Sequence, residues 1–173
     1  NGELATDRTK LKMKYLILSF LLLCCETTNS QSWYSYTIPV QALTSSPADG
    51  QTIYFGMLPK APVTAAATSR IYVRNPTRIN KVEVYTFSGT AGSNESWSLY
   101  VRVNNTTDVL VQTVSVSASE RVFTNSALNI TLNTNDYFEI KMINPTWGTN
   151  PLTFIAGGYV ICTSTLSQWP TNN

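Results

Sequence analysis

The chain has 173 residues, a formal net charge of +2 and no histidine, and only 13% of its residues are charged. This near-neutral balance argues against nucleic acid as a partner, because neutralising phosphates needs clustered surplus cations. The lack of histidine removes the most frequent general base and a common metal ligand. The composition therefore favours structural or recognition work over catalysis.

The N-terminal segment has the parts of a secretory signal peptide: a basic start at Lys14, an apolar run from Tyr15 to Cys25 and a small-residue exit ending at Ser30. The run is too short for a membrane span. We expect residues 1–30 to be upstream sequence plus signal peptide, with cleavage before Gln31 and a secreted or surface location. A lipid anchor on Cys25 and a buried helix are the alternatives.

Beyond an expected extended linker over residues 31–50, alternation of apolar and polar residues predicts a series of short strands separated by turn residues. The expected strands cover Thr52–Gly56, Ser69–Asn75, Ile79–Ser88, Trp97–Asn104, Val109–Val116, Arg121–Thr124, Ala127–Leu132, Tyr137–Ile143 and Leu152–Cys162. No amphipathic helix of useful length occurs. We predict an all-β fold, an antiparallel jelly-roll β-sandwich of eight or nine strands over residues 51–163, with a flexible tail over 164–173.

The two faces of these strands differ in composition. One face is aliphatic with Trp97 and Phe138, as expected of a core. The other carries tyrosine and arginine, and its candidate contact residues are Arg70, Tyr72, Arg74, Tyr85, Tyr100, Arg102 and Tyr137. Plain β-propensity, an oligomer interface and a ligand-binding face each account for this pattern.

Turn and loop residues carry the next set of expectations. Asn104–Asp108 predicts a hairpin loop and Asn133–Asp136 a turn, because Asn and Asp tolerate left-handed backbone. Gly157–Gly158 predicts a bulge or a close backbone approach. Cys162 is expected to be a buried thiol, with an intermolecular disulfide as the alternative.

The polar side chains suggest no chemistry. Glu139 and Lys141 share a strand face, as do Lys81 and Glu83, and both pairs are expected to be weak solvent-exposed ion pairs. No paired carboxylates, calcium-type loop or Gly-x-Ser-x-Gly elbow is present, so we expect no catalytic, cofactor or metal site.

One loop offers a candidate ligand contact. Trp147, flanked by Asn144 and Asn150, has the residue types that stack on and orient a sugar. The alternative is that Trp147 is a lid closing one end of the sandwich.

Several stretches resemble the jelly-roll heads of bacteriophage and viral fibre or appendage proteins. They are Ala48–Gly56, Ser88–Arg102, Asn104–Thr107, Asp136–Lys141 and Asn144–Trp147. The resemblance implies a tumour necrosis factor-like β-sandwich, often trimeric, at the surface of a virion. Its partners would be two further copies of the chain and a cell-surface glycan or protein receptor. The signal peptide and the lack of a fibrous stalk depart from that family. The alternative function is a monomeric secreted carbohydrate-binding module.

Overall fold

The computed structural model describes residues 33–45, 47–57, 66–88, 95–116, 120–151 and 153–165. Ten strands and one 3-10 turn, η1 (Ala66–Thr68), lie within these ranges. The predicted signal peptide and the candidate lipid anchor lie outside them. The predicted flexible tail over 164–173 is wrong at its start, because Ser164 and Thr165 are buried residues of the last strand, and its remainder lies outside the described residues.

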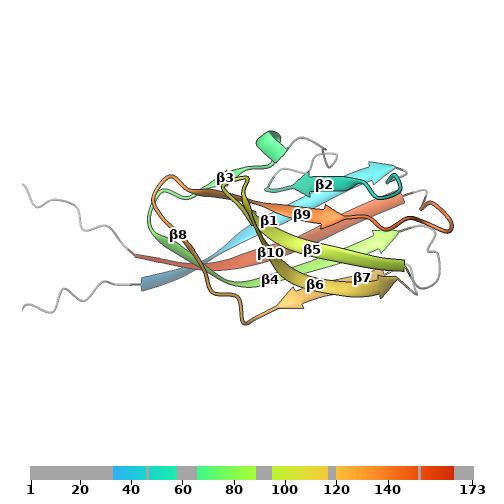
Figure 1. The fold of residues 1–173 in the computed structure, drawn as a ribbon. Coiled ribbons are helices and arrows are strands. Elements are labelled where there is room, and N and C mark those ends of the chain that lie inside the picture. The colour runs from blue at the N-terminus through green and yellow to red at the C-terminus, as the bar shows by residue number, and fades with distance from the viewer. Residues whose placement is uncertain are drawn as a thin grey trace, which may run out of the picture. The chain divides into compact units, whose positions relative to one another are not determined.

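The strands form two antiparallel sheets (Figure 1). Their bounds are β1 (Trp33–Ser45), β2 (Thr52–Phe55), β3 (Ile71–Tyr72), β4 (Thr77–Ser88), β5 (Glu95–Val103), β6 (Thr107–Val116), β7 (Glu120–Asn125), β8 (Ile130–Leu132), β9 (Tyr137–Ile143) and β10 (Thr153–Thr165). Sheet A has the order β1-β10-β4-β7, with β8 also paired to β4, and sheet B the order β2-β9-β5-β6, with β3 also paired to β9.

The pairing is nested: β1 pairs with β10, β2 with β9, β4 with β7, and β5 with β6. The chain therefore behaves as one long antiparallel hairpin wound into two layers, which is the jelly-roll arrangement. This confirms the predicted fold class. The described residues hold ten strands where the sequence suggested eight or nine, because β1 was taken for a linker.

β1 corrects the prediction of an extended linker over residues 31–50. Its thirteen residues pair with β10 along their whole length, from Trp33 opposite Thr165 to Ser45 opposite Thr153. The alternation that marks a strand is present, since Ile38, Val40 and Ala42 are buried between exposed neighbours. The segment contains Pro39, which is tolerated because β1 is an edge strand.

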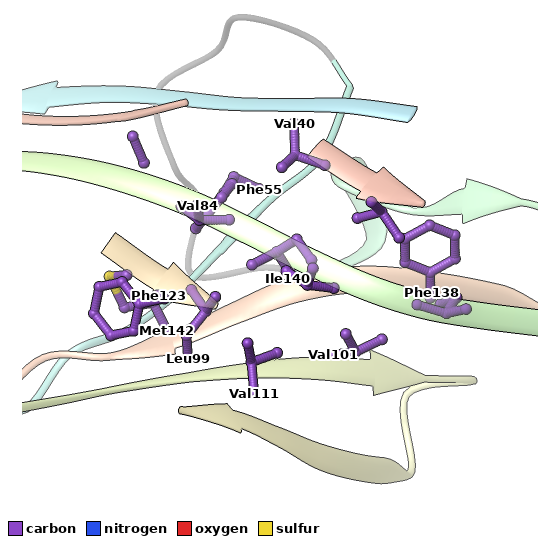
Figure 2. Close-up of a cluster of buried hydrophobic side chains, with 14 of the residues drawn as sticks. Val40, Phe55, Val84, Leu99, Val101, Val111, Phe123, Phe138, Ile140 and Met142 are labelled. Atoms are coloured by element: carbon purple, nitrogen blue, oxygen red, sulfur yellow. The ribbon is translucent and has the colours of Figure 1, made fainter. Parts of the chain in front are cut away.

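The core lies between the sheets and is filled by the predicted apolar face (Figure 2). Leu99 and Val101 of β5 and Ile140 of β9 have no exposed surface. Trp97 anchors one region of this core, with its ring centroid 5.2 Å from that of Phe154 and 6.4 Å from that of Phe123. Aromatic pairs at these separations add to the stabilisation from burial alone.

Two predicted turns are confirmed. Asn104 and Asn105 have φ of 50° and 59° in the loop that joins β5 to β6. Asn135 has φ of 71°, and the Asn133 amide donates a hydrogen bond to Asp136 Oδ2 over 2.7 Å. Asparagine suits these positions because it enters the left-handed region at low cost.

The glycine pair produces a close backbone approach. A Cβ on Gly158 would lie 2.1 Å from the carbonyl oxygen of Glu83, whereas a Cβ on Gly157 would meet nothing within 4 Å. β10 and β4 therefore come together tightly at Gly158. The register shift between them lies between Ile161 and Cys162, away from the glycines. Cys162 is fully buried, as predicted, and burial raises the pKa of its thiol to about 12.

The two sheets are joined along both long edges. The Gln41 amide of β1 donates to the carbonyl of Gly56, which follows β2, over 2.9 Å. On the other side, the Thr124 amide of β7 donates to Gln112 Oε1 of β6 over 2.8 Å, and Asn125 Nδ2 donates to the Val111 carbonyl over 3.2 Å. With the interior closed on both sides, the outer faces of the two sheets are the large surfaces left for function.

Candidate functional site

The tyrosines and arginines predicted to share one face are divided between the two sheets. Tyr85 lies on β4, in sheet A. Arg74 is exposed in the bend after β3. The remaining five belong to β9, β5 and the β3 segment of sheet B, and are Arg70, Tyr72, Tyr100, Arg102 and Tyr137. Alternation separates inward from outward positions, but it does not say to which sheet an outward residue belongs.

A row of charged residues crosses the centre of the sheet B outer face. Glu139 on β9 is the register partner of Arg102 on β5, and Arg70 precedes β3 on the other side of β9. Arg102 Nε lies 3.8 Å from Glu139 Oε1. Glu139 has 0% exposure, and in the described part of the chain neither of its carboxylate oxygens has a hydrogen-bond donor. The prediction that Glu139 forms a solvent-exposed pair with Lys141 is therefore wrong.

Burial dominates the electrostatics of Glu139. Loss of water raises the pKa of its carboxyl group, while the guanidinium groups of Arg102 and Arg70 oppose that rise and Asp108 reinforces it. Because the pKa of Glu139 is higher in the folded state than in the unfolded state, protonation of this carboxyl group stabilises the fold. That contribution to the free energy of unfolding is fully present below the ordinary glutamate pKa. That stability is lost as the pH rises through the folded value. The ionised carboxylate therefore destabilises the fold at neutral pH.

Arg102 has several partners, although its Nε is buried without a hydrogen bond. It donates to Tyr54 Oη over 2.9 Å and to the Asn105 carbonyl over 2.8 Å, and its Nε is 4.0 Å from Asp108 Oδ1. Lys141 pairs with the same Asp108 and lies 5.6 Å from the centre of the Tyr100 ring. This half of the face satisfies its own charges, so its arginine holds β2, β5 and the β5–β6 loop together.

The other half of the face has cations without carboxylate partners. Arg70 and Arg74 form no ion pair within the described ranges. The Arg70 guanidinium carbon lies 4.4 Å above the centre of the Tyr137 ring, and the Tyr137 ring lies 5.1 Å from that of Tyr72. Tyr72 is 56% exposed. This half presents an aromatic surface and two unpaired positive charges to solvent.

The sheet A outer face has a different character. Leu43 pairs with Ile155 and Ile155 with Phe87, while Tyr85 pairs with Val122, so these side chains form two adjacent rows. Leu43 is 57% exposed and Val122 is 50% exposed. We call these five residues the apolar patch. Gly157 pairs with Tyr85 beside these residues, and a Cβ built on it would meet nothing within 4 Å.

A polar group borders the apolar patch along β4 and β10. Lys81 Nζ lies 2.8 Å from Glu83 Oε2 and donates to Tyr159 Oη over 3.3 Å. These contacts raise the pKa of Lys81 and lower that of Glu83. The predicted solvent-face pair of Lys81 and Glu83 is confirmed.

The candidate sugar contact at Trp147 lies inside the sandwich. Its ring is 6% exposed and meets Trp97 edge-on at 5.1 Å. Asn144 is also buried, and its side chain donates to the Ala48 carbonyl over 3.1 Å, whereas Asn150 is exposed. Neither Trp147 nor Asn144 presents its side chain to a ligand, and their placement matches the alternative of a lid.

The loop between β9 and β10 is tied down by backbone contacts. The Trp147 amide donates to Asp49 Oδ1 over 3.2 Å, and the Gly50 amide donates to the Pro145 carbonyl over 2.9 Å. The Gly148 amide donates to Glu95. The lid is thus fixed to the turn that precedes β2 and to the start of β5.

Sequence reasoning missed Glu139, Tyr54 and Asp108 as members of the sheet B face. The feature that reveals Glu139 as a member of this face is the register of β9 against β5, which places Glu139 beside Arg102. That register follows from pairing between distant segments. In the described ranges, no three His, Cys, Asp or Glu residues group closely enough to hold a metal ion, and no helix is long and apolar enough to cross a membrane.

No family model and no curated protein matches the chain. Among solved structures, it is similar to the VP2 subviral particle of infectious bursal disease virus, with 12% identity and a TM-score of 0.43. That match covers 84% of this chain and 36% of the viral one, so this chain spans about a third of its length.

Two other solved structures are similar to the chain. One comes from Bacillus endospore appendages, described as disulfide-linked pili, with 11% identity, a TM-score of 0.36 and coverage of 83% of this chain and 96% of that chain. The other is a Podospora anserina GH26-CBM35 β-(1,4)-mannanase, with 12% identity, a TM-score of 0.34 and coverage of 82% and 29%. Likeness of this degree does not extend to function, and the jelly-roll assignment depends on the strand pairing itself.

Proposed function

We propose that this chain is a non-enzymatic jelly-roll module of a virion or secreted surface. It assembles with copies of itself through the outer face of sheet A and recognises a ligand through the outer face of sheet B. The observation that carries the proposal is the contrast between these faces. One presents an apolar patch, and the other presents arginines without ion-pair partners among the described residues, beside the exposed ring of Tyr72 and the half-buried ring of Tyr137.

Self-association is the role suited to the apolar patch. The solvent side of an antiparallel sheet normally carries polar residues, yet Leu43, Ile155 and Val122 stand exposed on three strands of sheet A. No atom lies within 4 Å of a Cβ built on Gly157, so side chains of a second copy can approach the backbone there. Two such faces bury their apolar surface when they pack together. Packing of this face on the same face of a second copy gives a two-fold dimer, whereas the resemblance to fibre heads implies three copies, in which the patch would meet a different surface of its neighbour.

Sedimentation velocity of the chain at micromolar concentration tests the assembly. We expect a discrete oligomer for the native chain and a monomer for Ile155→Glu, because each interface would bury an unpaired charge. Tyr72→Glu is the matched control, since it places the same charge at a comparably exposed position on the other sheet. A monomeric native chain, or dissociation by Tyr72→Glu instead, would contradict the assignment of the interface to sheet A.

A monomeric secreted carbohydrate-binding module is the second candidate function. Exposure of Tyr72 next to Tyr137 favours it, because an aromatic ring suits the apolar face of a sugar. In this hypothesis the sugar stacks on Tyr72 and not on Trp147. The hypothesis predicts a native monomer whose glycan binding is lost in Tyr72→Ala and retained in Ile155→Glu, and a glycan array with no hits would rule it out.

A further inference from the structure

The sheet B face contains a corner where several unpaired groups converge. It consists of Arg70, Tyr72, Arg74, Asn135 and Tyr137, which we call the Arg70 corner. The Asn135 amide donates to the Val73 carbonyl over 2.9 Å, and the Val73 amide donates to the Asp136 carbonyl over the same distance. These two bonds hold the 133–136 turn against the segment that carries Tyr72 and Arg74.

The charge at the corner is not compensated locally. Asp136 is the nearest carboxylate in the turn, and its two oxygens accept hydrogen bonds from Asn104 Nδ2 over 2.8 Å and from the Asn133 amide over 2.7 Å. Glu139 is buried and has Arg102 at 3.8 Å. Arg70 and Arg74 therefore form no ion pair among the described residues, although Arg70 interacts with the Glu139 charge at longer range, in contrast to Arg102, which has four partners.

The geometry of Arg70 is suited to an anionic group. Its guanidinium carbon lies 4.4 Å over the centre of the Tyr137 ring, a cation–π contact that restrains the side chain. The N–H edge of a guanidinium binds a carboxylate or sulfate in a bidentate manner. Arg70 Nε is buried and has no hydrogen-bond acceptor in the described part of the chain, so a ligand would meet the terminal nitrogens of the guanidinium.

Next to this edge lie groups that suit a sugar ring. Tyr72 is 56% exposed and lies 5.1 Å from Tyr137, so it offers a ring face for stacking. Asn135 is exposed in the adjoining turn and carries both an amide donor and an acceptor for hydroxyl groups. Two unpaired cations are too few for a nucleic acid backbone or a membrane surface, and match one or two negative charges.

We propose that the Arg70 corner is a binding subsite for an acidic saccharide, in which Arg70 and Arg74 bind the carboxylate or sulfate and Tyr72 stacks on the sugar ring. This inference rests on the proposed recognition role of sheet B and names its ligand class. It does not depend on the assembly through sheet A.

A glycan array with matched acidic and neutral members, probed with the full chain, tests the proposal. We expect hits only among carboxylated or sulfated glycans, and loss of those hits in Arg70→Gln. Calorimetry with lactose, sulfated lactose and sialyllactose then gives affinities. We expect the acidic forms to bind at least about tenfold more tightly than lactose, with that advantage lost in Arg70→Gln, as for one charged hydrogen-bond pair.

Arg78→Gln is the control. Arg78 also lies over an aromatic ring, 6.0 Å from the centre of Trp33, but it belongs to sheet A. The Arg78→Gln substitution should leave the affinities for lactose, sulfated lactose and sialyllactose unchanged. Equal binding of neutral and acidic glycans, no acidic hits, or equal effects of Arg70→Gln and Arg78→Gln would each overturn the inference. Full competition by millimolar inorganic sulfate or acetate would also overturn it, since it would show a site for the free ion only.

The outcomes separate this inference from the proposed function. If binding depends on Tyr72 but not on Arg70, sheet B recognises a ligand of another class and only the acidic saccharide fails. If Tyr72→Ala and Arg70→Gln both leave all ligand binding intact, recognition through sheet B fails with it.

Discussion

At the scale of single residues, Glu139 is the position where the fold departs most from expectation. A carboxylate on an outer strand face is ordinarily solvated, but this one is covered by its neighbours and has no hydrogen-bond donor among the described residues. Removing one partner of a buried ion pair usually destabilises a protein because a charge is left alone. Here Arg102 keeps Asp108, Tyr54 and the Asn105 carbonyl, so that loss is small.

Glu139→Gln is therefore expected to stabilise the chain at neutral pH by about 1 kcal/mol, the scale of one poorly satisfied buried group. Glutamine resembles the protonated acid, and the raised pKa of Glu139 means that the fold disfavours the charged carboxylate relative to this neutral form. The gain should be largest at pH 7 and vanish as the pH falls below the ordinary glutamate pKa, where the native residue is protonated. Urea denaturation at several pH values measures it, and a variant less stable than the native chain at pH 7 would contradict this account.

At the scale of elements, the contact between β10 and β4 depends on one glycine of the pair. Gly158→Ala would drive a methyl group into the Glu83 carbonyl, so strands in the centre of sheet A must separate. We expect a loss of about 2 kcal/mol or more, the cost of overpacking a rigid core. Gly157→Ala is the matched control, since its Cβ meets nothing, and thermal denaturation of the two variants should differ clearly. Equal stability would show that the backbone relaxes.

The β9–β10 loop is an element whose central side chain supports the fold. Trp147→Ala should lower the free energy of unfolding by about 3 kcal/mol, because a buried aromatic ring is replaced by a cavity against Trp97. Guanidinium denaturation followed by circular dichroism measures the change. Asn150→Ala, in the same loop but exposed, should be neutral. Native-like stability in Trp147→Ala would restore the sugar-contact hypothesis.

At the scale of the whole molecule, nested pairing joins the two ends of the described chain. Trp33 pairs with Thr165, so the outermost ladder closes only when distant segments meet. In folds of this kind, large loops must close before long-range contacts form to offset the entropy cost of closing them. Such folds therefore form slowly. We expect refolding in milliseconds to seconds, measured by stopped-flow tryptophan fluorescence at nanomolar concentration, so that assembly does not contribute. Microsecond refolding would be inconsistent with the nested order.

The sequence by itself determined which side of each strand faces inward and where the chain turns. Ile71, Leu99 and Ile140 are buried as their alternation predicts, because the period of a strand is local. Asn104 and Asn135 mark turns for an equally local reason, the tolerance of asparagine for positive φ.

Only the tertiary structure decided which outward residues lie together. Tyr85 and Tyr72 have the same local pattern, yet long-range pairing places them on different sheets. Register, too, is non-local, and it sets Glu139 between two arginines and out of water. The same holds for Trp147, a loop residue that the packing of β5 and β10 draws into the core. Surfaces in this protein arise from pairings that no short stretch of sequence specifies, and its candidate function depends on those surfaces.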